Sequence, residues 1–321
     1  MGHPLSEKSI LVTGAAGCIG AWVVKGLQDV GAIPVVFDIS ENRRRLDLVM
    51  KNAESVNWIV GDITDFNQVI NTVQDYDIYG IIHLAALQVP FAKADPLLGT
   101  RVNVLGTQHV LEAARLASVN RIAYASSIAA PAMGENDYLD TLYGAHKICN
   151  EQMAKVYWQD WRISSVCIRP GVIYGPGRDQ GMSAAPTLAL LAAFGGHAYN
   201  IPFVGPVSYV HVEDAAQRFI GAISREIEGS LIFDMNGVVA DMEKVLSDIE
   251  AIFPGNSVTA TGASLPFPAE TDDGLLDNFL QINSHRSFRQ GLDGTIDVFN
   301  SAAKRGVLGP EQVAQMIGVG S

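Results

Sequence analysis

Tyr143 and Lys147 are the two side chains of this sequence whose spacing most directly suggests chemistry. Residues four apart lie on one face of a helix, about a turn from each other. A free tyrosine titrates at about pH 10 and is a poor base at neutral pH, but a neighbouring ammonium group favours the phenolate. Such a pair could exchange a proton with a substrate hydroxyl. The spacing alone is a weak motif, so its meaning depends on the rest of the chain.

A glycine-rich segment near the start of the chain could hold the phosphates of a cofactor. In "TGAAGCIG" (13–20), Gly14, Gly17 and Gly20 are spaced G-x-x-G-x-x-G and enclose Cys18 and Ile19. Glycine lets a diphosphate approach the backbone closely, and a following helix offers free N–H groups and the positive end of its dipole. The position between an apolar run and a helical pattern favours a dinucleotide site over a structural turn.

Asp38 ends the second apolar run, about 20 residues after the glycines, where dinucleotide-binding folds place an acid. Its carboxylate could accept hydrogen bonds from both adenosine ribose hydroxyls and would repel a 2′-phosphate, which favours NAD over NADP. Arg43, Arg44 and Arg45 argue the other way, because guanidinium groups bind phosphate. We interpret these arginines as the solvated face of a helix. Asp62 could hold the adenine edge or cap the next helix.

An alternation of buried strands and helices must position these residues. Nearly continuous apolar runs, which suit strands buried on both faces of a parallel sheet, occupy 9–14, 33–38, 57–62, 80–86, 121–127 and 164–170. Helical patterns lie between them at 18–30, 42–53, 65–75, 99–118 and 143–160. The alternation predicts an α/β fold with a doubly wound parallel sheet of the Rossmann type.

The residue composition and the pattern of the chain change after Pro170. Residues 171–206 are rich in Gly and Pro, whereas 207–236 return to strand, helix and strand. We expect 1–170, together with 207–236, to form an NAD-binding Rossmann domain. We expect 171–206 and 237–321 to form a smaller substrate-binding lobe.

The composition excludes several classes of function. The 321 residues are 48% hydrophobic and 17% charged, with a net charge of −12. An acidic surface argues against nucleic-acid or anionic-membrane binding. The three cysteines lack metal-ligand spacing, so we expect no metal site and thiols that are reduced and buried. We find neither a signal peptide nor an apolar run of the roughly 18 residues that would suggest a membrane span, and expect a cytoplasmic protein.

In their order along the chain, the motifs resemble the extended short-chain dehydrogenase/reductases, the NAD-dependent epimerase/dehydratase group. The resemblance covers roughly residues 8 to 310 and rests on "TGAAGCIG", "FDISEN", "GDITD", "HLAA", "NVLGTQHVLEAA", "YASS", "YGAHK", "IRPGVIYGPG" and "YVHVEDAA". It implies a Rossmann body with a small substrate domain. It also implies a homodimer formed by the helices at 99–118 and 143–160.

The resemblance carries roles onto matching positions. Tyr143 and Lys147 match a catalytic Y-x-x-x-K pair, and Ser127 rather than Ser126 aligns with the catalytic hydroxyl. Lys147 would also bind the nicotinamide ribose, and Ser127 would stabilise charge on the substrate oxygen. The matching cofactor contacts are Gly14, Gly17, Cys18, Ile19, Gly20, Asp38, Asn42, Asp62, Ile63, Leu84, Ala85, Ala86, Asn103, Tyr143, Lys147 and Pro170.

Three departures from the family pattern narrow the expected reaction. Ile128 and Ala129 stand where the family's dehydratases carry an Asp-Glu pair, which disfavours sugar dehydration. Val172 replaces an Asn that nucleotide-sugar enzymes of the family usually carry, and Gln88 replaces a Lys that galactose epimerases carry. These two changes weaken the case for a UDP- or dTDP-sugar without excluding it.

The loop "GPGRDQGMSAAP" (175–186) lies where this fold places its substrate loops. Arg178 could contact an anionic or polyhydroxylated group, or else form a salt bridge within the loop to Asp179 or to another acid. The other candidate substrate contacts are Gln88, Ser127, Val172, Met182 and Ser183. His146, beside Lys147, is expected at the surface or an interface.

The predicted function is that of an NAD-dependent dehydrogenase acting on a small hydroxylated compound: a sugar, a sugar acid or another secondary alcohol. The first alternative is an epimerase of a sugar or nucleotide sugar, in which NAD is reduced and reoxidised within one turnover. The second is a non-catalytic regulator that senses NAD(P). Such regulators commonly lose the tyrosine or the lysine, and both are present here.

Overall fold

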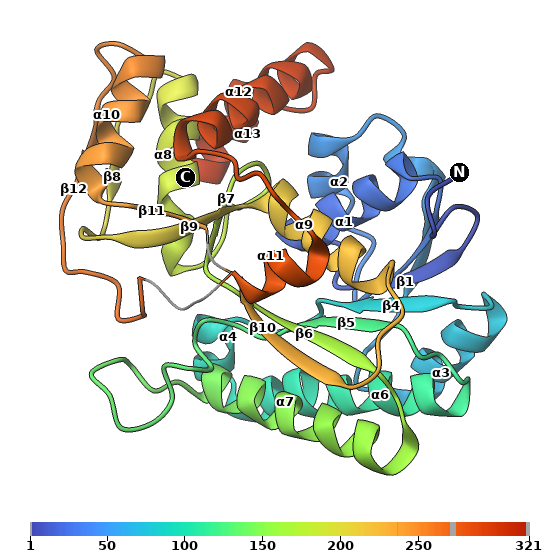
Figure 1. Cartoon of the computed structure of the whole chain (residues 1–321). Coiled ribbons are helices and arrows are strands. Elements are labelled where there is room, and N and C mark those ends of the chain that lie inside the picture. The colour runs from blue at the N-terminus through green and yellow to red at the C-terminus, as the bar shows by residue number, and fades with distance from the viewer. Residues whose placement is uncertain (1, 236, 270–273, 319–321) are drawn as a thin grey trace.

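A seven-stranded parallel sheet crosses the molecule, with helices on both faces (Figure 1). The computed structural model describes residues 2–235, 237–269 and 274–318, without the side chain of Met182. The strand order is β10-β6-β5-β4-β1-β2-β3, and every neighbouring pair is parallel. The strands are β1 (Ser9–Thr13), β2 (Ile33–Asp38), β3 (Asn57–Val60), β4 (Gly80–His83), β5 (Ile122–Ala125), β6 (Ser165–Pro170) and β10 (Ser230–Met235). The predicted doubly wound α/β fold is confirmed.

Two layers of helices bury the two faces of this sheet. On one face α1 and α9 pack against each other, and on the other α3, α6 and α7 lie side by side (Figure 1). The helices of these layers are α1 (Cys18–Asp29), α2 (Arg44–Val49), α3 (Phe66–Asp75), α6 (Gly106–Leu116), α7 (Leu142–Trp161) and α9 (Val212–Ile223). The apolar strands are covered on both sides, which explains their continuous hydrophobic runs.

Several predicted elements are shorter than expected because their apolar runs continue into loops. β3, β4 and β5 end at Val60, His83 and Ala125, two or three residues before their predicted ends. The predicted helix 99–118 is made of three segments. These and the other short helical segments are α4 (Val89–Ala94), α5 (Pro96–Thr100), the π-helix η2 (Arg101–Leu105) that leads into α6, and the 3-10 turns η1 (Ala53–Ser55) and η3 (Met182–Ala184).

The rest of the chain builds a smaller unit with its own apolar core. It contains a three-stranded sheet, β11-β9-β7, and a two-stranded sheet, β12-β8. Its strands are β7 (Val172–Tyr174), β8 (Tyr199–Ile201), β9 (Val207–His211), β11 (Val238–Ala240) and β12 (Val258–Ala260). Its helices are α8 (Ala185–Phe194), α10 (Met242–Ile252), α12 (Phe288–Lys304) and α13 (Pro310–Ile317). α11 (Leu275–Leu280), which we expected in the lobe, packs instead against β10 and α9.

The segment 207–236 is divided between the two units. β10 pairs with β6 in the central sheet, and α9 packs against α1. β9, which we expected in the Rossmann body, instead pairs with β7 and β11. All five residues of β9 are buried, so an apolar run does not reveal which sheet it joins. Asn236, the last residue of this predicted segment, lies outside the described residues, as do 270–273 and 319–321 of the predicted lobe.

Candidate active site

A cavity of about 680 Å³ lies at the carboxyl ends of the central strands. β1 and β4 are neighbours although they are not consecutive, so the strand order reverses between them. Open α/β sheets bind ligands at this kind of switch point. Fifteen predicted cofactor contacts line the cavity: Gly14, Gly17, Cys18, Ile19, Gly20, Asp38, Asn42, Asp62, Ile63, Leu84, Ala85, Ala86, Tyr143, Lys147 and Pro170. The predicted substrate contacts that line it are Gln88, Ser127, Val172, Arg178 and Ser183, while the side chain of Met182 lies outside the described part.

The glycine loop is folded tightly against the segment that follows β4. Gly14 has a φ of +74°, and a Cβ on it would stand 2.6 Å from the backbone nitrogen of Ala85. A Cβ on Gly20 would stand 2.4 Å from the carbonyl oxygen of Gly14. Gly17 begins α1 without a side-chain cap. The first N–H groups of this helix therefore meet the cavity without a competing side-chain acceptor, as an anion site requires.

Asp38 lies at the end of β2 and accepts a hydrogen bond from the backbone N–H of Ala16 at 2.9 Å. Burial raises the pKa of its carboxyl group, and the backbone N–H groups around it oppose that rise. Asp62 accepts from the backbone N–H of Thr64, at 2.8 Å. The helix that Asp62 could have capped is capped by Asp65 instead.

The arginine cluster is not the solvated helix face that the sequence suggested. Arg43 donates to the backbone carbonyls of Ala53 and Val56. Arg44 and Arg45 both pair with Asp179, whose side chain is only 4% exposed. Arg45 also donates to the Ala16 carbonyl at 2.7 Å and the Gly177 carbonyl at 3.0 Å. These bonds tie the loop after β7 to the glycine loop.

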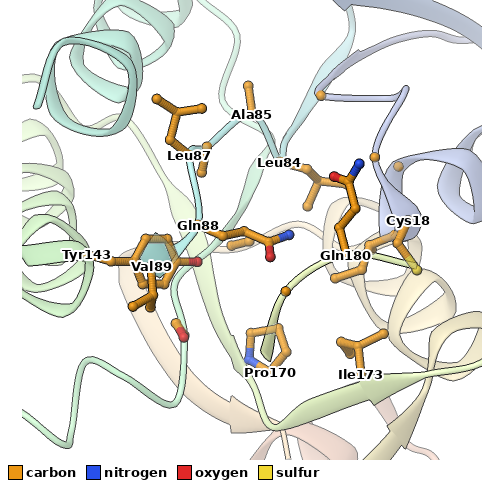
Figure 2. Close-up of a pocket in the computed structure, with 18 of the residues that line it drawn as sticks. Cys18, Leu84, Ala85, Leu87, Gln88, Val89, Tyr143, Pro170, Ile173 and Gln180 are labelled. Atoms are coloured by element: carbon orange, nitrogen blue, oxygen red, sulfur yellow. The ribbon is translucent and has the colours of Figure 1, made fainter. Parts of the chain in front are cut away.

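Lys147 is buried in α7 close to Tyr143. Its Nζ donates to the carbonyl oxygen of Ala125 at 2.6 Å and lies 5.3 Å from the centroid of the Tyr143 ring. Thr141 caps the start of α7: its hydroxyl accepts a hydrogen bond from the N–H of Gly144 at 2.9 Å. In Figure 2 the hydroxyl of Tyr143 points towards the amide of Gln88. The helix start and the end of β5 together fix where this pair stands.

The two adjacent serines have different partners. Ser126 donates to Oε1 of the buried Glu151 at 2.6 Å, and Glu151 also receives two hydrogen bonds from Arg169. Ser127 accepts from the N–H of Ala129 at 3.1 Å and lines the cavity. The hydroxyl hydrogen of Ser126 is therefore occupied, whereas that of Ser127 can be directed at a ligand.

Asn103 and His146 are both buried and lie behind the wall of the cavity. Asn103 does not line the cavity; its side chain accepts from the N–H of Leu87 at 2.7 Å and donates to the Leu87 carbonyl at 2.9 Å. His146 is buried and within hydrogen-bonding distance of Thr100 and Asn103, so its predicted place at the surface is wrong. The local sequence does not reveal these hydrogen bonds, because the partners of each residue come from separate elements.

The substrate loop presents Arg178 to the cavity, and Asp179, one of the acids that could have paired with it, pairs with Arg44 and Arg45 instead. Its Nη2 donates to Ser183 at 3.0 Å and its Nη1 contacts Gln88 Oε1 at 3.5 Å. Leu265 and Phe267 also line the cavity and were missed by the sequence analysis. They belong to an irregular segment with no recognisable motif.

The model of the NAD-dependent epimerase/dehydratase family matches residues 10–232. The chain belongs to this family. Its members and structural neighbours are enzymes of the extended short-chain dehydrogenase/reductase type, which confirms the predicted resemblance. Among the described residues, no helix combines the length and apolarity needed to cross a bilayer.

Two relatives and one solved structure illustrate what the chain is similar to. A UDP-glucose 4-epimerase of Mycolicibacterium smegmatis is 30% identical over 229 residues, 66% of this chain and 72% of the relative. An uncharacterized protein of Methanocaldococcus jannaschii is 30% identical over 189 residues, which cover 53% of this chain and 58% of the length of that protein. The solved structure of MoeE5 in complex with UDP-glucose and NAD is 25% identical, with a TM-score of 0.75 over 92% of this chain and 99% of that one.

Proposed function

We propose that this chain is an NAD-dependent dehydrogenase that transfers a hydride between NAD and a secondary alcohol on a small hydroxylated substrate. One observation carries the proposal: a single cavity joins the glycine loop and Asp38 to Ser127, Tyr143 and Lys147. The family comparison supports NAD chemistry at such a site. The smaller unit is proposed to supply the substrate side through the loop after β7.

The residues of the cavity fit the cofactor that the family implies. The uncapped start of α1 suits a diphosphate and Asp38 suits a ribose. NAD, when bound, would accept the hydride. Ser127 would hold the substrate oxygen by a hydrogen bond, and Tyr143 would take the hydroxyl proton. The positive charge of Lys147 would stabilise the phenolate, because its Nζ is fixed close to the ring by Ala125.

Asp179 is proposed to reinforce the preference for NAD. It occupies the two guanidinium groups, Arg44 and Arg45, that could otherwise attract a 2′-phosphate near Asp38. Asp179→Asn should release them and raise the affinity for NADPH relative to NADH about tenfold, the scale of one charge-assisted contact. Fluorescence titration with each nucleotide measures the ratio. Asp293→Asn, in an exposed pair with Arg289, is the control. If the ratio of the two affinities is unchanged in Asp179→Asn, Asp179 does not contribute to the preference for NAD.

The second candidate is an epimerase of a nucleotide sugar, favoured by the similarity to UDP-glucose 4-epimerases. The two reactions differ in whether NADH leaves the protein. Incubation with NAD and a panel of polyols, hydroxy acids and UDP-sugars, followed at the NADH absorbance band and by product analysis, separates them. Turnover of a UDP-sugar without NADH release, alongside inactivity towards all free alcohols, would replace the first candidate by the second.

The two serines provide a test of the catalytic assignment. Ser127→Ala should lower kcat about 10²-fold with little change in Tm, because the hydroxyl serves the transition state. Ser126→Ala should instead reduce the free energy of unfolding by about 1–3 kcal/mol, since a hydrogen bond to the buried Glu151 is lost. Steady-state kinetics and thermal denaturation read the two effects separately. The reverse pattern would exchange the roles of the serines.

We also propose a homodimer through α6 and α7. The apolar stripe of the first helix that we expected at the interface, Val110, Leu111 and Ala114, is buried within the monomer and cannot form it. A different set of apolar side chains on these two helices is exposed: Leu116, Leu142, Val156 and Trp161. Cys149, which we expected to be buried, is exposed on α7 between Leu142 and Val156, at intervals of seven residues along one face.

Val156→Asp should convert the dimer to a monomer, because a charge would be buried at the interface. The molar mass measured by light scattering should fall from twice the chain mass of 34.4 kDa to the chain mass itself. Val239→Asp on β11 is the control and should stay dimeric. Cys149 should also be alkylated faster in the monomer. Cys18 and Cys167 should remain slow in both, since burial raises the pKa of each thiol to about 12. A wild-type chain of monomer mass would refute the dimer.

A further inference from the structure

We propose that Arg178 forms a dedicated carboxylate subsite, so that the substrate is a hydroxy acid rather than a neutral alcohol or a nucleotide sugar. The proposal rests on the proposed dehydrogenase function and narrows its substrate class. It concerns the side of the cavity formed by the loop after β7 and by Gln88 at the start of α4.

Arg178 is a cation without a carboxylate partner among the described residues. Its Nε is buried and has no hydrogen-bond acceptor there. Asp179, the next residue, is committed to Arg44 and Arg45 on the other side of the loop. Burying an unpaired guanidinium is costly. The guanidinium of Arg178 therefore gains an anionic partner only when a ligand with a negative charge binds in the cavity.

Two neutral groups hold the guanidinium in a fixed orientation. Ser183 accepts from Nη2, and Oε1 of Gln88 accepts from Nη1. Because Oε1 faces Arg178, the amide nitrogen of Gln88 remains available as a further donor. Figure 2 shows this amide reaching into the cavity beside Tyr143. A guanidinium fork and an amide N–H₂ together suit the two oxygens of one carboxylate.

The charge of the cavity matches a single carboxylate better than a nucleotide diphosphate. Three cationic side chains line it among the described residues: Arg45, Lys147 and Arg178. Arg45 shares the carboxylate of Asp179 with Arg44, and Lys147, which keeps its charge, is held beside Tyr143 by the Ala125 carbonyl. Arg178 is therefore the one of these three cations that neither pairs with a carboxylate nor serves the proposed proton transfer, which suits a ligand with one carboxylate better than a diphosphate with two negative charges.

The diphosphate of the cofactor is a less suitable partner for Arg178. The glycine loop and the start of α1 already provide backbone N–H groups for it. Gln88 after β4 and Ser183 in η3 orient Arg178, and neither belongs to the glycine loop. The guanidinium interacts electrostatically with Cys18 of that loop and with Tyr143, so it is near both; its hydrogen bonds to Gln88 and Ser183 favour the ligand that reacts at Tyr143.

The expected reaction leaves the carboxylate unchanged. The carbinol carbon gives up its hydride to NAD⁺, and the hydroxyl proton passes to Tyr143. The hydroxy acid becomes a keto acid, NADH is formed, and one proton is released. Arg178 would hold the acid end while Ser127 and Tyr143 engage the hydroxyl end.

The test compares wild type, Arg178→Gln and the exposed control Arg289→Gln. Each protein is titrated with NADH by fluorescence. The NADH complex is then titrated with three acids, gluconate, glycerate and 3-hydroxybutyrate, and with their neutral counterparts glucitol, glycerol and 1,3-butanediol. Oxidation of the same compounds with NAD is followed in parallel. Arg178→Lys, which keeps the charge but not the fork, is included as the milder variant, and Tm verifies folding.

We expect wild type to bind at least one acid about 30-fold or more tightly than its neutral counterpart, the scale of a buried charged contact. Arg178→Gln should lose that preference, Arg178→Lys should lose part of it, and NADH affinity should stay within about twofold. A tenfold loss of NADH affinity in Arg178→Gln would assign the anion to the cofactor and overturn the proposal. Equal binding of acids and neutral compounds, or binding of neither, would also overturn it.

The failure of this proposal differs from the failure of the proposed function. Oxidation of a neutral alcohol by wild type, unaffected by Arg178→Gln, would remove the carboxylate subsite and leave hydride transfer intact. Absence of NADH binding to wild type would overturn the dehydrogenase function itself.

Discussion

Tyr143→Phe should lower kcat by about 10³-fold or more while leaving NADH affinity and Tm close to wild type. The substitution removes one hydroxyl, which points into the cavity in Figure 2, and keeps the ring beside Lys147. General acid–base groups typically contribute about 10²–10⁴ to the rate. Without the phenolate, the substrate proton has no positioned acceptor. Single-turnover formation of NADH from a substrate identified in the panel measures the chemical step directly.

Tyr76→Phe is the matched control for this variant, because Tyr76 is an exposed tyrosine at the end of α3, away from the cavity. It should keep wild-type kcat. A Tyr143→Phe enzyme that retained more than about a tenth of wild-type kcat would exclude Tyr143 as the proton-transfer residue. A regulator without catalysis would show no turnover in either variant.

Gly14→Ala should abolish NADH binding and reduce the free energy of unfolding by about 3 kcal/mol or more. The added Cβ would stand 2.6 Å from the nitrogen and 2.8 Å from the Cα of Ala85, and backbone atoms cannot rotate away as a side chain can. The glycine loop and the segment after β4 would have to separate. Chemical denaturation and NADH titration measure the two consequences.

Substitutions at two further glycines separate the two causes of the stability loss in Gly14→Ala, the strained φ angle and the contact with Ala85. Gly255 has a φ of +77° with no atom within 4 Å of an added Cβ, so Gly255→Ala reports the dihedral strain alone, about 1 kcal/mol. Gly17 has an ordinary φ of −76° and only the Gly14 carbonyl oxygen near, at 3.0 Å. Gly17→Ala should therefore fold but bind NADH more weakly, because its methyl group would line the cavity. Equal stability of the Gly14 and Gly255 variants would mean that the contact with Ala85 relaxes.

The parts of the site that could be predicted from the sequence are those built by short segments. Gly14, Asp38 and Tyr143 each sit at the end of a strand or the start of a helix that a local pattern announces. Parallel strands then carry such ends to one edge of the sheet, so order along the chain translates into proximity. The agreement of the central sheet with the predicted strands follows from the same property.

The unpredicted parts depend on partners that are distant in sequence. Arg45 and Asp179 are 134 residues apart, and no local pattern distinguishes this pairing from the expected solvated helix or from a bond between Arg178 and Asp179. His146 is buried because α5 and η2 cover it through Thr100 and Asn103. The sheet that β9 joins was likewise decided by tertiary pairing rather than by its own apolar residues.

Arg178 and Asp179 are consecutive in the chain but their side chains have different partners. Asp179 is anchored through Arg45 to the glycine loop, while Arg178 faces Gln88 and Ser183. A shift of the intervening peptide would move both residues. Occupancy of the cofactor part of the cavity should therefore change the affinity for the acid, and the acid should change the affinity for the nucleotide by the same factor. The two ligands should be thermodynamically coupled within a single polypeptide.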